Sequence, residues 1–499
     1  MILRLEGTSA DPDREVLGGK AWSIERMLSL GIPVPPAFVI PTTMCSRYYE
    51  AGRKLPDEVS AELPDAMAWL EQKTGKTFGG GELPLLVSVR SGAPKSMPGM
   101  MDTVLNLGMD DEVERIIGER TGDADFAADT RRRFLEQYES VVGQPPPDEP
   151  GEQLLGAISA VFDSWQSDRA NTYRKERGIP DEGGTAVTVQ AMVFGNLDDE
   201  SGTGVLFTRD PLRGESDPLG EWLPRGQGED VVSGRHDPLH LDELGEKHKH
   251  LHDELLEVAG TLEKDSRDAM DIEFTVESGK LWLLQSRVAK RSPEAAVRLA
   301  VQLAREGMIT ESEALDRVEP DQAAALLREH IDPVARADAE VLAEGKPACP
   351  GLSRGKIVSD SDEAERRALE GEEVLLGRPT TDPNDVHAMA VVAGIVTEMG
   401  GATSHAAVVS RELGVPCVVG CGEGKIVALA EREVTMDAGG GELLAGRLET
   451  RKVTEEDDPD LAELLAWARA DMVGHPAVTD SVDVNELHLP KLLALRRGP

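Results

Sequence analysis

Residues 88–103 read SVRSGAPKSMPGMMDT, and this stretch decides how the N-terminal part of the chain is interpreted. The apolar residues before Arg90 predict a short buried strand, which delivers Arg90 into a loop of Gly, Ser and Pro. Such a loop can fold over phosphate groups while Arg90 clamps them with two hydrogen bonds. A surface hairpin is the alternative. The apolar run Met97–Met101 is unusual for a solvated loop and favours a mobile lid over a ligand.

A second candidate phosphate-binding segment is Gly18-Gly19-Lys20, at the start of an amphipathic helical pattern over Lys20–Leu30. Paired glycines let backbone amides approach a phosphate, and Lys20 adds a positive charge. An ordinary turn before a helix would explain the same residues. The P-loop pattern is absent from the sequence.

Two predicted strands further along the chain carry polar side chains at a spacing of two. Asp271 and Glu273 share one face of the first strand, and Gln285 and Arg287 share one face of the second. Two carboxylates suit Mg²⁺, which prefers oxygen ligands and phosphate co-ligands. The pattern indicates a floor for a magnesium nucleotide. An exposed sheet face with an Arg–Glu pair is the alternative.

Residues 400–414 read GGATSHAAVVSRELG and contain a candidate nucleophile. Two glycines end a strand, and Thr403 or Ser404 can cap a helix that stops at Gly414. His405 then lies in the first helical turn, where backbone amides stabilise an anion attached to the imidazole. A neutral histidine is a competent nucleophile at neutral pH, although a lone histidine is more often structural.

Five other histidines gather in one charged stretch: His236, His240, His248, His250 and His252. His248 and His252 are four residues apart, a spacing that allows a metal site on one helix face. We favour a solvated polar helix for this stretch.

Composition restricts the classes of protein to which the chain can belong. Its 499 residues predict two to four domains of about 100–200 residues each. The net charge of −39 disfavours a partner such as nucleic acid or an anionic membrane, because phosphates would be repelled. Four scattered cysteines predict reduced thiols rather than a disulfide framework. No signal pattern opens the chain, and prolines interrupt the uncharged run 27–46, so we expect a cytoplasmic protein.

The pattern of predicted elements indicates an α+β and α/β multidomain fold. We expect a first domain over 1–291 with a helical subdomain at about 111–180. A helical connector over 292–345 precedes a small α/β domain over 346–447. The segment 448–499 is predicted to be an acidic linker and a helical C-terminal tail.

Taken together, these segments resemble the pyruvate, phosphate dikinase family of phosphoenolpyruvate-utilising enzymes. The run from Arg90 to Thr103 favours the dikinases over phosphoenolpyruvate synthase and rifampin phosphotransferase. Residues 31–38, 202–211, 227–232 and 271–287 continue the match, and Thr403–Ala407 resembles the phosphohistidine signature.

The resemblance implies an ATP-grasp nucleotide-binding domain followed by a swivelling phosphohistidine domain, with ATP and Mg²⁺ as ligands. Lys20, Arg90 and Arg287 would hold the nucleotide phosphates. Asp271, Glu273 and Gln285 would hold Mg²⁺ and nucleotide. His405 would accept a phosphoryl-type group, with pyrophosphoryl favoured, and AMP would be released. Arg378 and residues 381–385 resemble a family stretch near the histidine.

Two departures from the family pattern limit this expectation. Pro94-Lys95 replaces the usual small-residue segment before Ser96. The family's substrate barrel needs about 250 residues, and the segment after Asp460 is far too short for one. We therefore expect a short form that performs the ATP half-reaction. Phosphate, or pyruvate held by a separate barrel protein or another acceptor, would complete the transfer.

Two other readings remain open at this stage. One is a nucleotide-responsive regulatory or binding module without net turnover. The other is a truncated dikinase.

Overall fold

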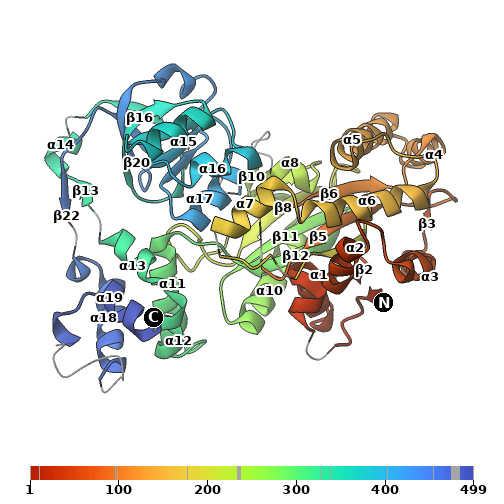
Figure 1. Cartoon of the computed structure of the whole chain (residues 1–499), viewed down its shortest axis with the longest axis horizontal. Helices are drawn as coiled ribbons and strands as arrows, with labels where there is room; N and C mark the ends of the chain where they lie inside the picture. Colours follow the sequence, from red (N-terminus) through yellow and green to blue (C-terminus); the bar gives the residue numbers. More distant parts are fainter. Residues whose placement is uncertain are drawn as a thin grey trace. The chain divides into compact units, whose positions relative to one another are not determined.

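The computed structural model describes residues 2–9, 12–95, 97, 99–176, 178–181, 183–232, 238–327, 329–337, 339–401, 403–452, 454–473 and 484–497 (Figure 1). Its helices and sheets confirm the predicted α+β and α/β multidomain class. Backbone contacts divide the chain into two compact units. The first contains Met1–Thr203, Pro224–Gly228 and Ile272–Arg287, and the second contains Gly204–Leu223, Glu229–Asp271 and Val288–Pro499.

A five-stranded sheet forms the core of the first unit, in the order β1-β2-β7-β5-β6. These strands are β1 (Leu3–Arg4), β2 (Ala37–Ile40), β7 (Ala186–Ala191), β5 (Val87–Gly92) and β6 (Thr103–Leu107). All residues of β2 and β7 are buried, as expected for apolar strands covered on both faces. The register sets Val89 opposite Val189 and Arg90 opposite Thr188, which fixes where Arg90 leaves the sheet.

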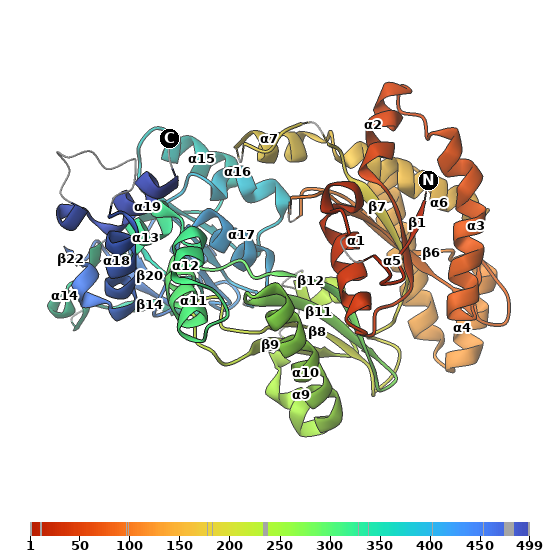
Figure 2. The ribbon, with the colours of Figure 1, turned by 90° about the horizontal axis from the view of Figure 1, so that it is seen from below.

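Seven helices of the described chain accompany this sheet, and Figure 2 shows α1 beside β7. They are α1 (Arg14–Ser29), α2 (Thr42–Glu50), α3 (Asp57–Thr74), α4 (Asp111–Thr121), α5 (Ala124–Val142), α6 (Pro150–Ser164) and α7 (Asp168–Glu176), with two short strands, β3 (Thr77–Phe78) and β4 (Pro84–Leu85). The helical region predicted at about 111–180 is thus confirmed as α4–α7.

A second five-stranded sheet has the order β10-β9-β8-β11-β12. Its strands are β8 (Gly202–Phe207), β9 (Leu219–Pro224), β10 (Leu239–His240), β11 (Met270–Glu277) and β12 (Lys280–Val288); α8 (Gly228–Val232), α9 (Asp242–Lys247) and α10 (Lys249–Ser266) fall between them in sequence. Ser278 and Gly279 join β11 to β12, both with positive φ angles (47° and 74°). Positive φ at both positions is typical of a two-residue type I′ turn. The two strands predicted to carry Asp271, Glu273, Gln285 and Arg287 are thus confirmed as neighbours in one sheet.

The C-terminal half of the second unit contains an eight-stranded sheet in the order β14-β21-β20-β16-β17-β18-β19-β15. The strands β16 to β19 are parallel, and their flanking neighbours are antiparallel. Their bounds are β14 (Val341–Glu344), β15 (Lys346–Cys349), β16 (Leu352–Val358), β17 (Val374–Arg378), β18 (Gly394–Thr397), β19 (Cys417–Val419), β20 (Glu433–Asp437) and β21 (Glu442–Ala445). The helices are α15 (Ser361–Leu369), α16 (Val386–Met389) and α17 (His405–Leu413).

A helical cluster completes the second unit. It combines α11 (Pro293–Arg305), α12 (Glu311–Arg317) and α13 (Pro320–Leu326) with α18 (Pro459–Asp471) and α19 (Leu489–Arg497), which lie side by side in Figures 1 and 2. Buried Leu303, Leu464 and Leu492 belong to their shared core. The predicted connector and the predicted C-terminal tail therefore pack on each other.

The segments between this cluster and the eight-stranded sheet are not helical throughout. The strand β13 (Glu329–Ile331) pairs with β22 (Thr450–Lys452), and α14 (Pro333–Ala337) follows β13. The strand β14 begins at Val341, so the eight-stranded sheet includes residues that we predicted to belong to the helical connector over 292–345. Across the described part of the chain, every helix falls short of the length and apolarity that a membrane crossing requires.

Candidate active site

A kinked helix brings Lys20 to the end of β5. Gly18 lies inside α1 with φ 71° and ψ 160°, a region that only glycine adopts readily. A Cβ atom there would lie 1.7 Å from the carbonyl oxygen of Gly92, so the close approach also requires glycine. Gly19 then donates its N–H to the carbonyl of Ala93 at 2.9 Å. The glycine pair therefore joins α1 to the loop that follows Arg90.

Four predicted site residues form one charged cluster in the first unit. The guanidinium of Arg90 lies 3.5 Å from the carboxylate of Glu273, and both side chains are largely buried. Burial raises the pKa of Glu273, but the charges of Arg90, Arg287 and Lys20 outweigh it and hold the pKa below its usual value. Burial, together with Arg90 and Arg287, holds the pKa of Lys20 well below its usual value, while Glu273 opposes that shift.

This cluster has more positive than negative charge. Three cationic side chains share one carboxylate, and repulsion by Arg90 and Arg287 adds to burial in lowering the pKa of Lys20. A polyphosphate would relieve that repulsion, because its oxygens accept charge-assisted hydrogen bonds from all three cations. The geometry thus suits the anionic part of a nucleotide.

Contacts between α1 and β12 hold the cluster's elements together. The hydroxyl of Ser23 donates to the carbonyl of Ser286 at 2.7 Å, and the N–H of Ser286 donates back to Ser23 Oγ at 3.0 Å. Ser286 stands between Gln285 and Arg287, which are half-buried. This pair of hydrogen bonds fixes the position of β12 beside the helix that carries Lys20.

The predicted magnesium ligands provide oxygen donors but no complete cage. Asp271 and Glu273 both lie on β11, two residues apart, and Asp271 is buried. Within the described ranges, no three or more His, Cys, Asp or Glu side chains are grouped so as to hold a metal ion. Two carboxylates and the amide of Gln285 are a fitting donor set for Mg²⁺, which commonly keeps waters and substrate phosphates as ligands.

The methionine-rich loop has a packing role that the sequence did not indicate. Met97 and Met100 are buried. Arg169 of α7 donates from Nε to the carbonyl of Met100 at 3.2 Å and forms an ion pair with Asp102. Burial of Met97 and Met100 accounts for these two apolar residues without a ligand, so the mobile lid stays a prediction. Ser96 and Pro98 lie outside the described residues.

In the second unit, His405 opens α17 with one ring nitrogen engaged. Nδ1 lies 3.1 Å from Thr381 Oγ1, and Nε2 is buried with no hydrogen-bond partner among the residues that the structure describes. Burial lowers the pKa of His405 below its usual 6.5, although Asp382 and Asp385 act in the opposite direction. The lowered pKa favours the neutral imidazole at physiological pH, with Nε2 as the ring nitrogen that has no partner among the described residues.

The expected helix cap before His405 needs a correction. Ser404 occupies the N-cap position, but its side chain makes no capping hydrogen bond. The hydroxyl of Thr403 donates instead to Glu221 of β9. The first-turn amides of α17 are thus not satisfied by the side chain at the N-cap.

A buried acid network positions Thr381. Asp385 accepts the backbone N–H of Asp382 at 3.0 Å and a hydrogen bond from Ser361, and it lies 3.5 Å from the Arg378 guanidinium. Arg378 also donates to the carbonyl of Ser359 at 3.1 Å. The stretch that the sequence placed near the histidine therefore does lie beside it. Its specific contact, from Thr381 to Nδ1, was not foreseen.

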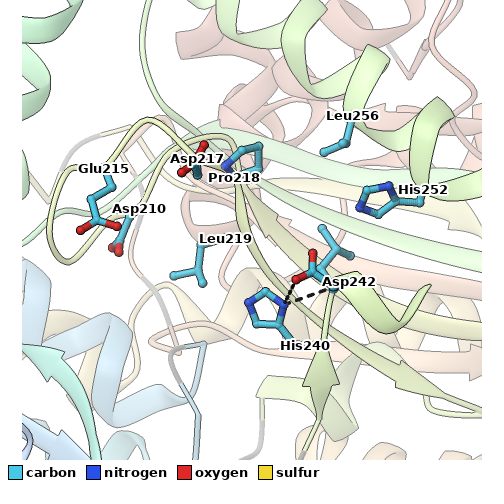
Figure 3. A pocket seen from close by; sticks show the side chains of 10 residues that line it. Asp210, Glu215, Asp217, Pro218, Leu219, His240, Asp242, His252 and Leu256 are labelled. Atoms are coloured by element: carbon cyan, nitrogen blue, oxygen red, sulfur yellow. Dashed lines mark hydrogen bonds and ion pairs between the residues drawn. The ribbon is translucent and has the colours of Figure 1, made fainter. Parts of the chain in front are cut away.

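The histidine-rich stretch that contains His240 and His252 borders a cavity of about 380 Å³ in the second unit (Figure 3). His240 and His252 line it with carboxylates, and His240 Nδ1 lies 3.1 Å from Asp242. His252 belongs to α10, and His248 immediately precedes this helix. No metal-binding group of three such side chains occurs here or elsewhere in the described chain. His236 lies outside the described residues.

Comparison with known proteins assigns a family to both parts of the chain. Residues 14–248 match a family model described as pyruvate phosphate dikinase, AMP/ATP-binding domain. Residues 370–441 match one described as PEP-utilising enzyme, mobile domain. The chain belongs to the pyruvate, phosphate dikinase family. The first match contains Lys20 and Arg90, and the second contains His405.

Relatives of this family are similar along most of the chain. A pyruvate, phosphate dikinase of Rhizobium meliloti is 40% identical over 93% of this chain and 59% of the relative. That of Clostridium symbiosum is 39% identical over 91% of this chain and 59% of the relative. Pyruvate, phosphate dikinase 2 of Zea mays is 40% identical over 87% of this chain and 54% of the relative. The chain thus spans somewhat more than half the length of these relatives.

Proposed function

We propose that this protein binds Mg-ATP and transfers a phosphoryl-type group from it to His405, with release of AMP. Lys20, Arg90 and Arg287 would hold the phosphates, while Asp271, Glu273 and Gln285 would hold Mg²⁺ and the nucleotide. The observation that carries the proposal is the state of His405, a neutral imidazole with Nδ1 engaged and Nε2 uncommitted.

The hydrogen bond to Thr381 would leave Nε2 as the reacting nitrogen in the tautomer that carries the proton on Nδ1. With the proton on Nδ1, that N–H donates to Thr381 Oγ1, and the lone pair of Nε2 is available for attack. Nε2 would form a bond to the β-phosphorus of ATP while the bond from that phosphorus to the oxygen of AMP breaks. A pyrophosphoryl group on His405 results, and the family resemblance favours this form over phosphoryl.

Charge neutralisation would come from the cluster around Glu273. Phosphoryl transfer depends chiefly on aligning the reacting groups and stabilising the charge on the transferred oxygens. Arg90 and Arg287 supply fixed charges, and a bound polyphosphate would favour the charged form of Lys20, whose pKa is lowered by burial and by these two neighbours. Bound Mg²⁺ would neutralise further charge on the phosphates. Reacting atoms must approach within about 3–3.5 Å.

In onward transfer, phosphate would take the outer phosphoryl unit and leave as pyrophosphate, so that one phosphoryl unit stays on His405. That unit would then pass to an acceptor such as pyruvate, held by a barrel or by another protein. The names of the relatives support pyruvate and phosphate as co-substrates. A nucleotide-responsive regulatory module remains the alternative outcome of the experiment below.

The test uses ATP labelled at the β or γ position, with Mg²⁺ and without pyruvate. Acid-labile label from both positions is expected on the wild-type chain and on a His387→Ala variant. His387 is a matched control, since it is a half-buried histidine of the same sheet domain, paired with Asp362 at 3.2 Å. His405→Ala should carry no label. Tight ATP binding without label on the wild-type chain would favour the regulatory module.

A further inference from the structure

Two cysteines lie directly opposite each other on neighbouring strands of the eight-stranded sheet. Cys349 of β15 is the cross-strand partner of Cys417 of β19, in an antiparallel pair. All four cysteines of the chain are free thiols in the structure, and all are buried. The cross-strand placement of two of them was not foreseen from the sequence.

Directly opposed positions on antiparallel strands are ones that a disulfide can span. Directly opposed residues of antiparallel strands have Cα atoms about 4.5–5.5 Å apart, with side chains on the same face. Disulfides span Cα separations of about 4.4–6.8 Å. Bond formation between Cys349 and Cys417 therefore requires side-chain rotation rather than rearrangement of the sheet.

Both thiols face the helix that carries His405. Cys417 Sγ lies 4.0 Å from the carbonyl of Ala406 in α17. Arg411 of the same helix donates to the carbonyl of Ala348 at 3.2 Å, beside Cys349. The positive charge of Arg411 acts on the pKa of both thiols, against the larger effect of burial. The two sulfur atoms thus share one environment beneath α17.

The third cysteine of this domain lies on the other face of the sheet. Cys421 packs in a core with Val418, Ile357 and Val396. Consecutive residues of a strand point to opposite faces of the sheet. Val418 and Cys421 pack in the core on one face, so the side chain of Cys417 lies on the other face. Cys421 is therefore a natural control, since it is as buried as the pair and close in sequence but lies on the wrong face.

The position of β15 gives the buried pair a route to solvent. It is the last strand in the sheet order, it has only four residues, and it includes Pro347, which cannot donate a ladder hydrogen bond. A register irregularity separates Pro347 from Cys349. Burial raises the pKa of Cys349 to about 12, so the closed sheet protects the thiol. Local opening of a short edge strand would expose it.

We propose that Cys349 and Cys417 are an oxidisable pair that forms a disulfide when the protein meets a peroxide. The exposed thiolate of Cys349 attacks hydrogen peroxide, which yields a sulfenic acid and releases water. After β15 closes, the thiol of Cys417 attacks the sulfenic sulfur, a second water leaves, and the S–S bond forms. Both thiols are oxidised and the peroxide is reduced. The bond then fastens the edge strand β15 to β19 beneath α17.

The test treats the full chain with hydrogen peroxide, quenches it and counts thiols after denaturation. Wild type should fall from four free thiols to two, and dithiothreitol should restore them. Peptide mapping without reductant should join the segments around Cys349 and Cys417. Cys421→Ser should still form this link, whereas Cys417→Ser and Cys349→Ser should not.

A thermal measurement gives a second readout. Oxidation should raise the Tm of wild type and Cys421→Ser and leave the Tm of the two pair variants unchanged. Four remaining thiols in the wild type, or a link to Cys421, would overturn the proposal. These readouts do not depend on ATP or on His405, so the outcome is independent of the proposed function.

Discussion

The cation cluster around Glu273 and the site around His405 are built in opposite ways. The cluster collects Lys20, Arg90, Glu273 and Arg287 from four elements, α1, β5 and the consecutive strands β11 and β12, and concentrates charge. The histidine site has Thr381 as the partner of the imidazole and Asp382 and Asp385 as its nearby charges, all from one short stretch, and the pKa of His405 is lowered. The contrast suggests that one region captures an anionic substrate while the other preserves a nucleophile.

The largest effect on the labelling of His405 is expected from removing a positive charge of the cluster around Glu273. Arg90→Met should reduce labelling of His405 by at least about 10³-fold, because a cation that neutralises a transferred phosphoryl group has an effect of this size. Lys95→Met is the control in the same loop, since Lys95 is exposed. Initial labelling rates measure both variants, with circular dichroism as the check on folding. Equal labelling rates for the two variants would show that the charge of Arg90 does not contribute to the transfer.

The backbone that places Lys20 can be tested without removing any charge. Gly18→Ala should lower the free energy of unfolding by about 3 kcal/mol, because the φ/ψ region is nearly closed to other residues and the Cβ meets Gly92. Gly31→Ala shares a positive φ of 74° but meets no atom within 4 Å, so a cost of about 1 kcal/mol is expected.

Urea unfolding measures these stabilities, and equilibrium dialysis measures ATP affinity. Only Gly18→Ala should weaken ATP binding. If both variants bind ATP equally well, the close approach of α1 to β5 does not position the phosphate site.

These two regions also differ in how far the sequence predicts them. The spacing of Asp271, Glu273, Gln285 and Arg287 was sufficient to predict two strands with polar side chains on one face of each, because strand periodicity is a local property. The hydrogen bonds between Ser23 and Ser286 join residues far apart in the chain, and no local pattern indicates them.

The same distinction holds within the smaller sites. The glycine pair and the helix start predicted where His405 lies, because capping and helix termination are local. The partner of Nδ1 depends on the packing of the loop at Thr381, which Asp385 holds from the protein interior. Arg169, which contacts the methionine-rich loop from α7, gave no sequence signal.

A smaller effect is expected from the hydrogen bond that orients the imidazole. Thr381→Val keeps the shape of the side chain and removes its hydroxyl, which should slow labelling about tenfold for the loss of one hydrogen bond. ATP affinity should not change, because the cluster is untouched. Thr381→Ser restores the hydroxyl and should recover most of the rate. A Thr381→Ser variant as slow as Thr381→Val would assign the effect to packing.

The smallest effect concerns pH. The pKa of His405 lies below 6.5, so the labelling rate should be constant at neutral pH and fall only in more acidic solution, where a proton occupies Nε2. Asp382→Asn removes a charge that raises this pKa, so the acidic limb should move to lower pH. Asp362→Asn is the control, since it changes an exposed carboxylate paired with His387. A limb that moves to higher pH would contradict this assignment.

The most direct test is the position of phosphorus on the imidazole. The wild-type chain is incubated with Mg²⁺ and ATP, quenched in alkali, and examined by phosphorus NMR and peptide mapping. We expect the modification on Nε2 of His405, with one AMP released for each modified chain. Modification at Nδ1 or at another residue, or AMP release without modification, would contradict the account.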